Sequence, residues 1–183
     1  MPKSRGRKKP SKKQSRGHLH AVPDQPVGRE LLDGFSEADI DDLQDAVERR
    51  MFAMPYVGTR IGDDEFPELD PDDPNERGIL IKGEHPAYHD ALVDPDFDGE
   101  IDGVSPRRHL LMHEIVANQL WDNELPEVWQ TARRLLALGH DRHNILHALG
   151  EVSMRQLQAS LTEQRLFDRE QYCADLNQLG RDI

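Results

Sequence analysis

Apolar residues recur three and four positions apart along much of this chain, which predicts amphipathic α-helices. The first predicted helix spans about residues 36–54, with Ser36 as its N-cap and Pro55 as the residue that stops it. Its apolar residues form one stripe: Ile40, Leu43, Val47, Met51 and Met54. We interpret this stripe as an ordinary packing surface.

The second half of the chain predicts four more helices. They cover about residues 105–121, 125–138, 141–161 and 168–179. Ser105 and Asp141 are suitable N-caps, Pro106 suits the first position of a helix, and Gly139 suits a helix end. The pattern therefore favours an all-α fold, a small helical bundle.

An acidic, proline-containing segment separates the first helix from the others. Because like charges at this density repel and extend the chain, we predict a loop over residues 58–76. A short apolar run follows at 78–82, and Pro86 then suits the first position of a short helix with His85 as its cap.

Residues 94–102 resemble the start of a calcium-binding loop. Asp94, Asp96 and Asp98, followed by Gly99, match the first positions of an EF-hand. The twelfth position, where a Glu should complete the site, is Ser105. This mismatch favours a solvated acidic connection over a calcium site.

Charge is distributed unevenly along the chain. The 183 residues have a formal net charge of −12, yet residues 1–20 contain no acidic side chain. The basic residues of this stretch are Lys3, Arg5, Arg7, Lys8, Lys9, Lys12, Lys13 and Arg16. With almost no apolar residues to bury, residues 1–27 are predicted to be a disordered basic tail, and residues 28–183 one helical domain.

A basic tail on an acidic domain is typical of an arm that contacts RNA or the ribosome, and equally of a solubilising tail without a dedicated partner. No aromatic residue is interleaved with the charges, so sequence-specific recognition is not expected. The single cysteine, Cys173, excludes a disulfide framework within the chain. No apolar run approaches the roughly 20 residues that span a bilayer. We expect a cytoplasmic protein without a membrane partner.

Six of the nine histidines occur in H-x-x-x-H pairs: His85/His89, His109/His113 and His143/His147. Residues four apart share one face of a helix, so each pair can direct two imidazoles to one point. A buried polar ring without a partner costs about 1–3 kcal/mol, and a metal ion satisfies several such rings at once. We predict a divalent metal site (zinc, iron or manganese) built from His109, His113, His143 and His147, with His85, His89 and Glu151 as additional ligands.

The alternative is that the histidines are core residues, each hydrogen-bonded to a backbone carbonyl, an acid or Tyr88. Leu110 follows His109 and Asn144 follows His143, so the pattern is not the H-E-x-x-H of zinc peptidases. In a catalytic site, an open coordination position would activate water or dioxygen, and Glu151 would accept the proton. The competing function is metal-free binding of RNA or the ribosome through the basic arm.

Three segments resemble a small bacterial family of unknown function: 84–92, 105–113 with Gln119, and 143–147. That family shows H-P-x-Y-H, then N-P-x-L-H-x-x-x-H followed by a Gln, then H-x-x-x-H. The resemblance covers residues 78–160 and implies an all-helical fold without an established activity. This chain has Ser105 in place of the usual Asn and Arg108 in place of an apolar residue, which alters the helix cap and leaves the histidines in place.

Overall fold

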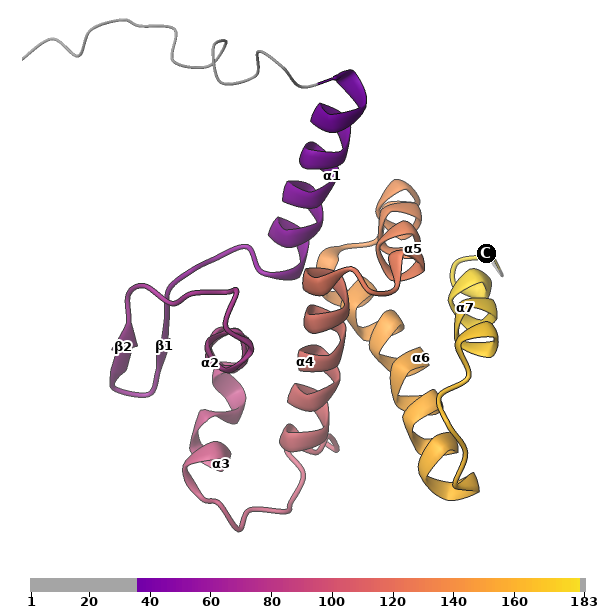
Figure 1. Ribbon diagram of the computed structural model, residues 1–183. Coiled ribbons are helices and arrows are strands. Elements are labelled where there is room, and N and C mark those ends of the chain that lie inside the picture. The colour runs from indigo at the N-terminus through magenta and orange to yellow at the C-terminus, as the bar shows by residue number, and fades with distance from the viewer. Residues whose placement is uncertain (1–35, 182–183) are drawn as a thin grey trace, which may run out of the picture. The chain divides into compact units, whose positions relative to one another are not determined.

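The computed structural model describes residues 36–181, which form helices and one small hairpin (Figure 1). The elements in chain order are α1 (Glu37–Ala53), β1 (Thr59–Ile61), β2 (Asp64–Phe66), α2 (Pro74–Gly83), the 3₁₀ turn η2 (Pro86–Tyr88), α3 (His89–Val93), α4 (Pro106–Asp122), α5 (Pro126–Ala137), α6 (Arg142–Glu163) and α7 (Arg169–Gln178). The predicted helical class is confirmed. The predicted tail, 1–27, and the first residues of the predicted domain, 28–35, lie outside the described residues.

The helices that carry the histidine pairs begin where local side chains cap them. The Ser105 hydroxyl accepts a hydrogen bond from the Arg108 amide at 3.5 Å, and the Asp141 carboxylate accepts one from the Asn144 amide at 3.0 Å. Each cap satisfies an amide that has no partner within the helix. The starts of α4 and α6 are therefore fixed by residues next to them in sequence.

The prediction of a loop over the acidic segment, residues 58–76, is wrong in part, because the segment contains two short strands and the start of a helix. The strands β1 and β2 pair antiparallel, with Gly62 in the turn at a φ of 59°. Asp73 then caps α2, its carboxylate accepting from the Asn75 amide, and Pro74 occupies the first helical position. The prolines and acids of this segment act as turn and cap residues in short elements, and α2 begins four residues before the apolar run.

The main core lies around α4 and α6, which run side by side (Figure 1). Helices α1, α5 and α7 complete it, and its buried residues are Phe52, Ala53, Val116, Leu120, Val128, Trp129, Ala132, Leu135, Ile145, Leu146, Leu149, Val152, Tyr172 and Leu176. A second cluster, Met54, Leu80, Ile81, Leu110 and Ala117, packs α2 against another face of α4. Helix α4 is therefore covered by α6 on one side and by α2 on another.

Most of the predicted stripe on α1 is exposed, which corrects the packing interpretation. Leu43, Val47 and Met51 are 54%, 54% and 56% exposed. The helix meets the core through Asp45, which accepts a hydrogen bond from Trp129 Nε1 at 2.8 Å, and near its end, where the buried Arg49 guanidinium donates to the carbonyls at the end of α4. Large apolar side chains of the later helices that are also exposed are Leu111, Leu136, Leu138, Leu157 and Leu161.

Across residues 36–181, no helix combines the length and the apolar character needed to cross a bilayer.

Candidate metal centre

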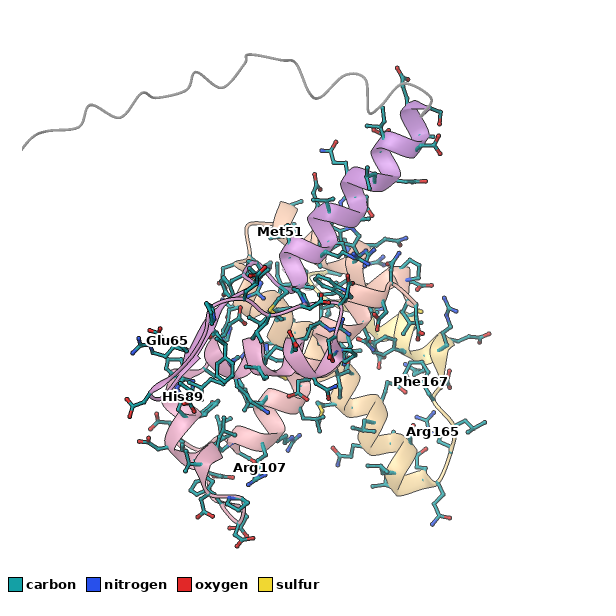
Figure 2. The ribbon with its side chains drawn as sticks, turned by 60° about the vertical axis from the view of Figure 1, so that its left-hand side comes forward. Met51, Glu65, His89, Arg107, Arg165 and Phe167 are labelled. Atoms are coloured by element: carbon teal, nitrogen blue, oxygen red, sulfur yellow. The ribbon has the colours of Figure 1, made fainter. Side chains whose placement is uncertain are left out.

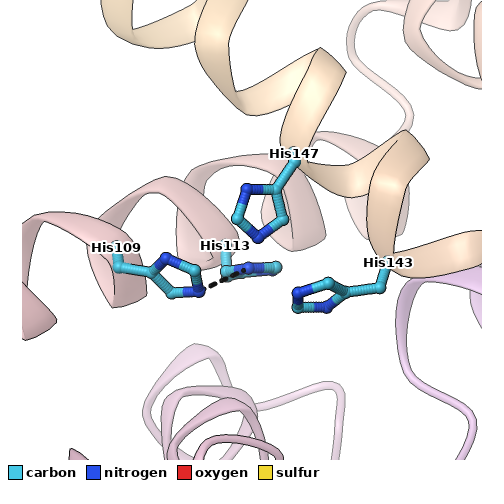
Figure 3. A group of neighbouring side chains, drawn as sticks. All are labelled: His109, His113, His143 and His147. Atoms are coloured by element: carbon cyan, nitrogen blue, oxygen red, sulfur yellow. Dashed lines mark hydrogen bonds between the residues drawn. The ribbon is translucent and has the colours of Figure 1, made fainter. Parts of the chain in front are cut away.

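Helices α4 and α6 bring two histidine pairs together (Figure 3). His109 and His113 come from α4, and His143 and His147 come from α6. One ring nitrogen of each residue lies within 4.8 Å of the corresponding nitrogen of every other. The Nε2 atoms of His109 and His113 are 3.1 Å apart. These four histidines, the four-histidine cluster, are close enough to hold one metal ion.

The cluster lies at the edge of the core. The His113 ring is 2% exposed, His109 and His147 are half-buried, and His143 is exposed. The Nε2 atom of His147 is buried and has no hydrogen-bond partner. An imidazole nitrogen in this condition loses its interaction with water and gains nothing in return, whereas an ion between the rings would satisfy it.

Burial and crowding keep the rings of His109, His113 and His147 uncharged. Burial, and then the neighbouring His85, lower the pKa of His109 to about 4 and the pKa of His113 to about 2. Burial also lowers the pKa of His147, although the nearby Glu151 carboxylate acts in the opposite direction. Since the neutral imidazole is the form that binds a metal ion, these rings are in the binding form at neutral pH.

These pKa values predict that the metal-free protein loses stability in acid. Histidine in the unfolded chain has a pKa of about 6.5. As the pH falls below that value, the histidines of the unfolded chain become protonated. In the folded protein His109 stays neutral down to about pH 4 and His113 down to about pH 2. Each such histidine lowers the free energy of unfolding by up to about 1.4 kcal/mol per pH unit. Urea unfolding with a chelator between pH 7.5 and 5 measures this slope.

A His113→Leu variant should show a shallower decline over the same pH range, because it removes the ring with the lowest pKa. The matched control is His140→Ala, which lies away from the cluster and should keep the wild-type slope. Equal slopes in wild type and His113→Leu would contradict the assignment of this effect to the cluster.

His85, in the segment between α2 and η2, lies against the four-histidine cluster. Its ring centroid lies 4.9 Å from that of His109 and 4.6 Å from that of His113, and the residue is 8% exposed. Its Nδ1 is 2.7 Å from the Ile81 carbonyl oxygen, which can only accept, so Nδ1 carries the proton. Its Nε2 is therefore a free acceptor, and it is buried without a partner.

The structure does not bring His89 into the cluster. Its Nε2–H donates to the Lys82 carbonyl at 3.0 Å, and its Nδ1 accepts from the Gly62 amide at 3.3 Å. Figure 2 shows His89 at the side of the hairpin that carries Glu65. His85 caps the 3₁₀ turn and His89 begins the next helix, so the two do not share a helical face. His89 fits the alternative of a hydrogen-bonded structural histidine.

Glu151 lies beside the four-histidine cluster and is not one of its members. It is exposed, and it lines a cavity of about 520 Å³ together with His109 and His147. Arg108 and Arg155 line the same cavity. The carboxylate thus lies beside the four-histidine cluster and outside its set of potential ligands.

An ion pair joins the two segments that carry His85 and His143. Arg142 Nη1 donates to the Glu84 carboxylate at 3.0 Å, and the same guanidinium donates to the carbonyls of Phe52 at 2.6 Å and Ala53 at 2.9 Å. Each partner directly precedes a histidine of the site. No sequence motif reveals this pair, because the two residues are 58 positions apart.

We predict that Glu84→Gln weakens metal binding by about 10-fold, in the range found for residues that orient ligands. The Arg142 guanidinium keeps its two carbonyl acceptors, so the fold should persist while the position of His85 relative to His143 loosens. Isothermal titration with a divalent ion measures the change. The exposed pair Arg60–Glu65 provides the control, since Glu65→Gln should leave the affinity unchanged.

The structure does not gather the acidic side chains of the calcium-like loop. Over the described range 36–181, the four-histidine cluster is the one group of three or more potential ligands that comes together. The Arg107 guanidinium donates instead to the loop carbonyls of Asp94, Pro95 and Phe97. A protein cation thus already occupies the carbonyl side of this loop, which favours the acidic connection.

No family model, curated protein or solved structure matches this chain. The resemblance to a bacterial family of unknown function therefore rests on its histidine motifs alone. The basic residues of the tail lie outside residues 36–181, and their contact with RNA or the ribosome stays a prediction.

Proposed function

We propose that this protein binds a divalent transition-metal ion through His109, His113, His143 and His147. The observation that carries the proposal is the convergence of four imidazole nitrogens within 4.8 Å, on two helices held by caps and a shared core. Hydrogen bonding alone explains the group poorly. Only His109 and His113 bond to each other, and the His147 Nε2 is left without a partner.

The donor set restricts the metal. Imidazole suits zinc, iron, copper and nickel, whereas manganese and magnesium favour carboxylate oxygen. No carboxylate belongs to the four-histidine cluster, and Glu151 lies beside it. Of the ions that the sequence suggests, zinc and iron therefore fit the donors better than manganese does.

The surroundings favour metal-assisted hydrolysis as the chemistry. A bound divalent ion with an open coordination position supplies activation of a water molecule. Glu151 lines the adjoining cavity beside His147 and is suited to hold the proton that such a water releases. Arg108 and Arg155 line the same cavity together with Glu100 and Glu151, so its charged lining offers both hydrogen-bond donors and acceptors to a polar substrate.

The test is the metal content of the full-length, untagged protein by mass spectrometry. We expect close to one ion per chain, lost in the double variant His113→Ala/His147→Ala. His140→Ala is the matched control, because it removes a histidine that lies outside the cluster, and it should keep its metal. Failure of the wild type to bind zinc, iron, nickel or copper, even after loading, would exclude the proposal.

A further inference from the structure

His113 is the centre of a group of five imidazoles. Its ring centroid lies 4.6 Å from that of His85, 4.7 Å from His109, 5.3 Å from His143 and 5.0 Å from His147. His113 is the most deeply buried of the four clustered rings, at 2% exposed. It thus has four imidazole neighbours at similar distances.

The other four rings form a closed circuit. Successive centroids are 4.9 Å (His85–His109), 4.7 Å (His109–His147), 4.5 Å (His147–His143) and 5.9 Å (His143–His85) apart. One diagonal, His109–His143, is longer, at 6.3 Å. On the other diagonal, no ring contact joins His85 and His147 in the described part of the chain. The circuit is four-sided, and His113 contacts each of its corners. His85 lies outside the group whose ligand nitrogens are all within 4.8 Å of one another, so its ring must move inward to bind the same ion.

These distances can be compared with the two common coordination geometries. With a metal–nitrogen bond of about 2.1 Å, a coordinated ring centroid lies roughly 3.2 Å from the ion, so rings at right angles are about 4.5 Å apart and opposite rings about 6.4 Å apart. A tetrahedral site would instead place every pair at about 5.2 Å. The 6.3 Å diagonal and the neighbours at 4.5–5.3 Å resemble a square pyramid, whereas the 5.9 Å edge between His143 and His85 is longer than that geometry requires.

His85 supplies the corner without which the base is incomplete. Its Nδ1–H is fixed on the Ile81 carbonyl at 2.7 Å, an arrangement that orients the ring and leaves Nε2 free to bind a metal. The Nε2 atom has no partner, and the residue is 8% exposed. The Glu84–Arg142 ion pair holds this segment against the start of α6.

We propose, on the basis of the proposed function, that His85 is a fifth ligand and that the site is a square pyramid of five imidazoles with its open position opposite His113. Such a site takes an ion that accepts five or six ligands with tetragonal geometry, copper(II) or nickel(II), in preference to zinc, whose structural sites are tetrahedral. The open position opposite His113 is where water or a substrate oxygen binds.

The variant that tests this ligand is His85→Phe in the full-length protein, which keeps an aromatic ring of similar size and removes both nitrogens. Nickel affinity should fall about 10–100-fold, and zinc affinity should change little because four histidines remain. Cobalt(II) in the wild type should show the weak visible absorption of five-coordinate cobalt, and in His85→Phe the intense bands of a tetrahedral site. His89→Phe, in the same segment, should match the wild type.

A tetrahedral cobalt spectrum in the wild type, unchanged by His85→Phe, would overturn the fifth ligand and leave the four-histidine site standing. A wild type that binds no metal would overturn both proposals. If His85→Phe does not fold by circular dichroism, X-ray absorption of the nickel-loaded wild type decides the question without a variant. Scattering from five imidazoles supports the proposal, and scattering from four contradicts it.

Discussion

Adding a divalent ion to the metal-free protein at 100 times its dissociation constant should stabilise the fold by about 2.7 kcal/mol. The cluster is assembled only when α4 and α6 pack together, so the ion binds the folded state and not the unfolded chain. For a domain of this size the gain corresponds to a rise of about 5–10 °C in the unfolding midpoint. Thermal unfolding followed by circular dichroism, with and without a chelator, measures it.

The double variant His113→Ala/His147→Ala should show no rise, because it removes one ligand from each helix. His140→Ala should respond as the wild type does. An equal rise in the double variant would show that the ion stabilises the protein from another place, such as the histidines of the basic tail. The response of the midpoint therefore separates binding at the cluster from binding elsewhere.

The parts of the fold and of the site that the sequence predicted are the local ones. Ser105 and Asp141 cap α4 and α6 through amides three residues away. The H-x-x-x-H spacing places both histidines of a pair on one face of a helix, whatever the helix packs against. Two pairs on two predicted helices were therefore enough to predict the four-histidine cluster.

The parts that sequence analysis missed depend on contacts between distant segments. His85 and His89 have the same spacing as the other pairs, but a 3₁₀ turn separates their faces and only His85 enters the site. The stripe on α1 has helical periodicity, yet Leu43 and Val47 are each 54% exposed in the part of the chain that the structure describes. The Glu84–Arg142 pair links positions that no local pattern connects. In each case the outcome depends on which distant segment packs against the residue, and the periodicity of the sequence does not contain that information.

Replacing Gly150 with Ala should weaken metal binding, because Gly150 lies where α6 approaches α4 closely. Gly150 follows His147 by nearly one turn, and a Cβ at this position would lie 2.2 Å from Met112 Cγ and 2.7 Å from Met112 Sδ. Carbon atoms pack at about 3.5–4.0 Å, so either the Met112 side chain changes its rotamer or α4 and α6 separate by on the order of 1 Å; we expect the helices to separate. Metal–ligand distances tolerate only about 0.2 Å.

We expect Gly150→Ala to lower metal affinity by about 100-fold, the upper end of the range found when ligands are misplaced. Its free energy of unfolding should fall by about 1–3 kcal/mol through overpacking. Titration calorimetry below the unfolding midpoint and urea unfolding measure the two effects separately.

Met112→Ala/Gly150→Ala removes the colliding atoms, so α4 and α6 can return to their spacing and affinity should recover towards wild type. Because Met112→Ala leaves space in the core, this double variant should remain less stable than wild type. Recovered affinity without recovered stability would show that Gly150 sets the distance between the two histidine pairs, whereas affinity still lost in the double variant would contradict that role.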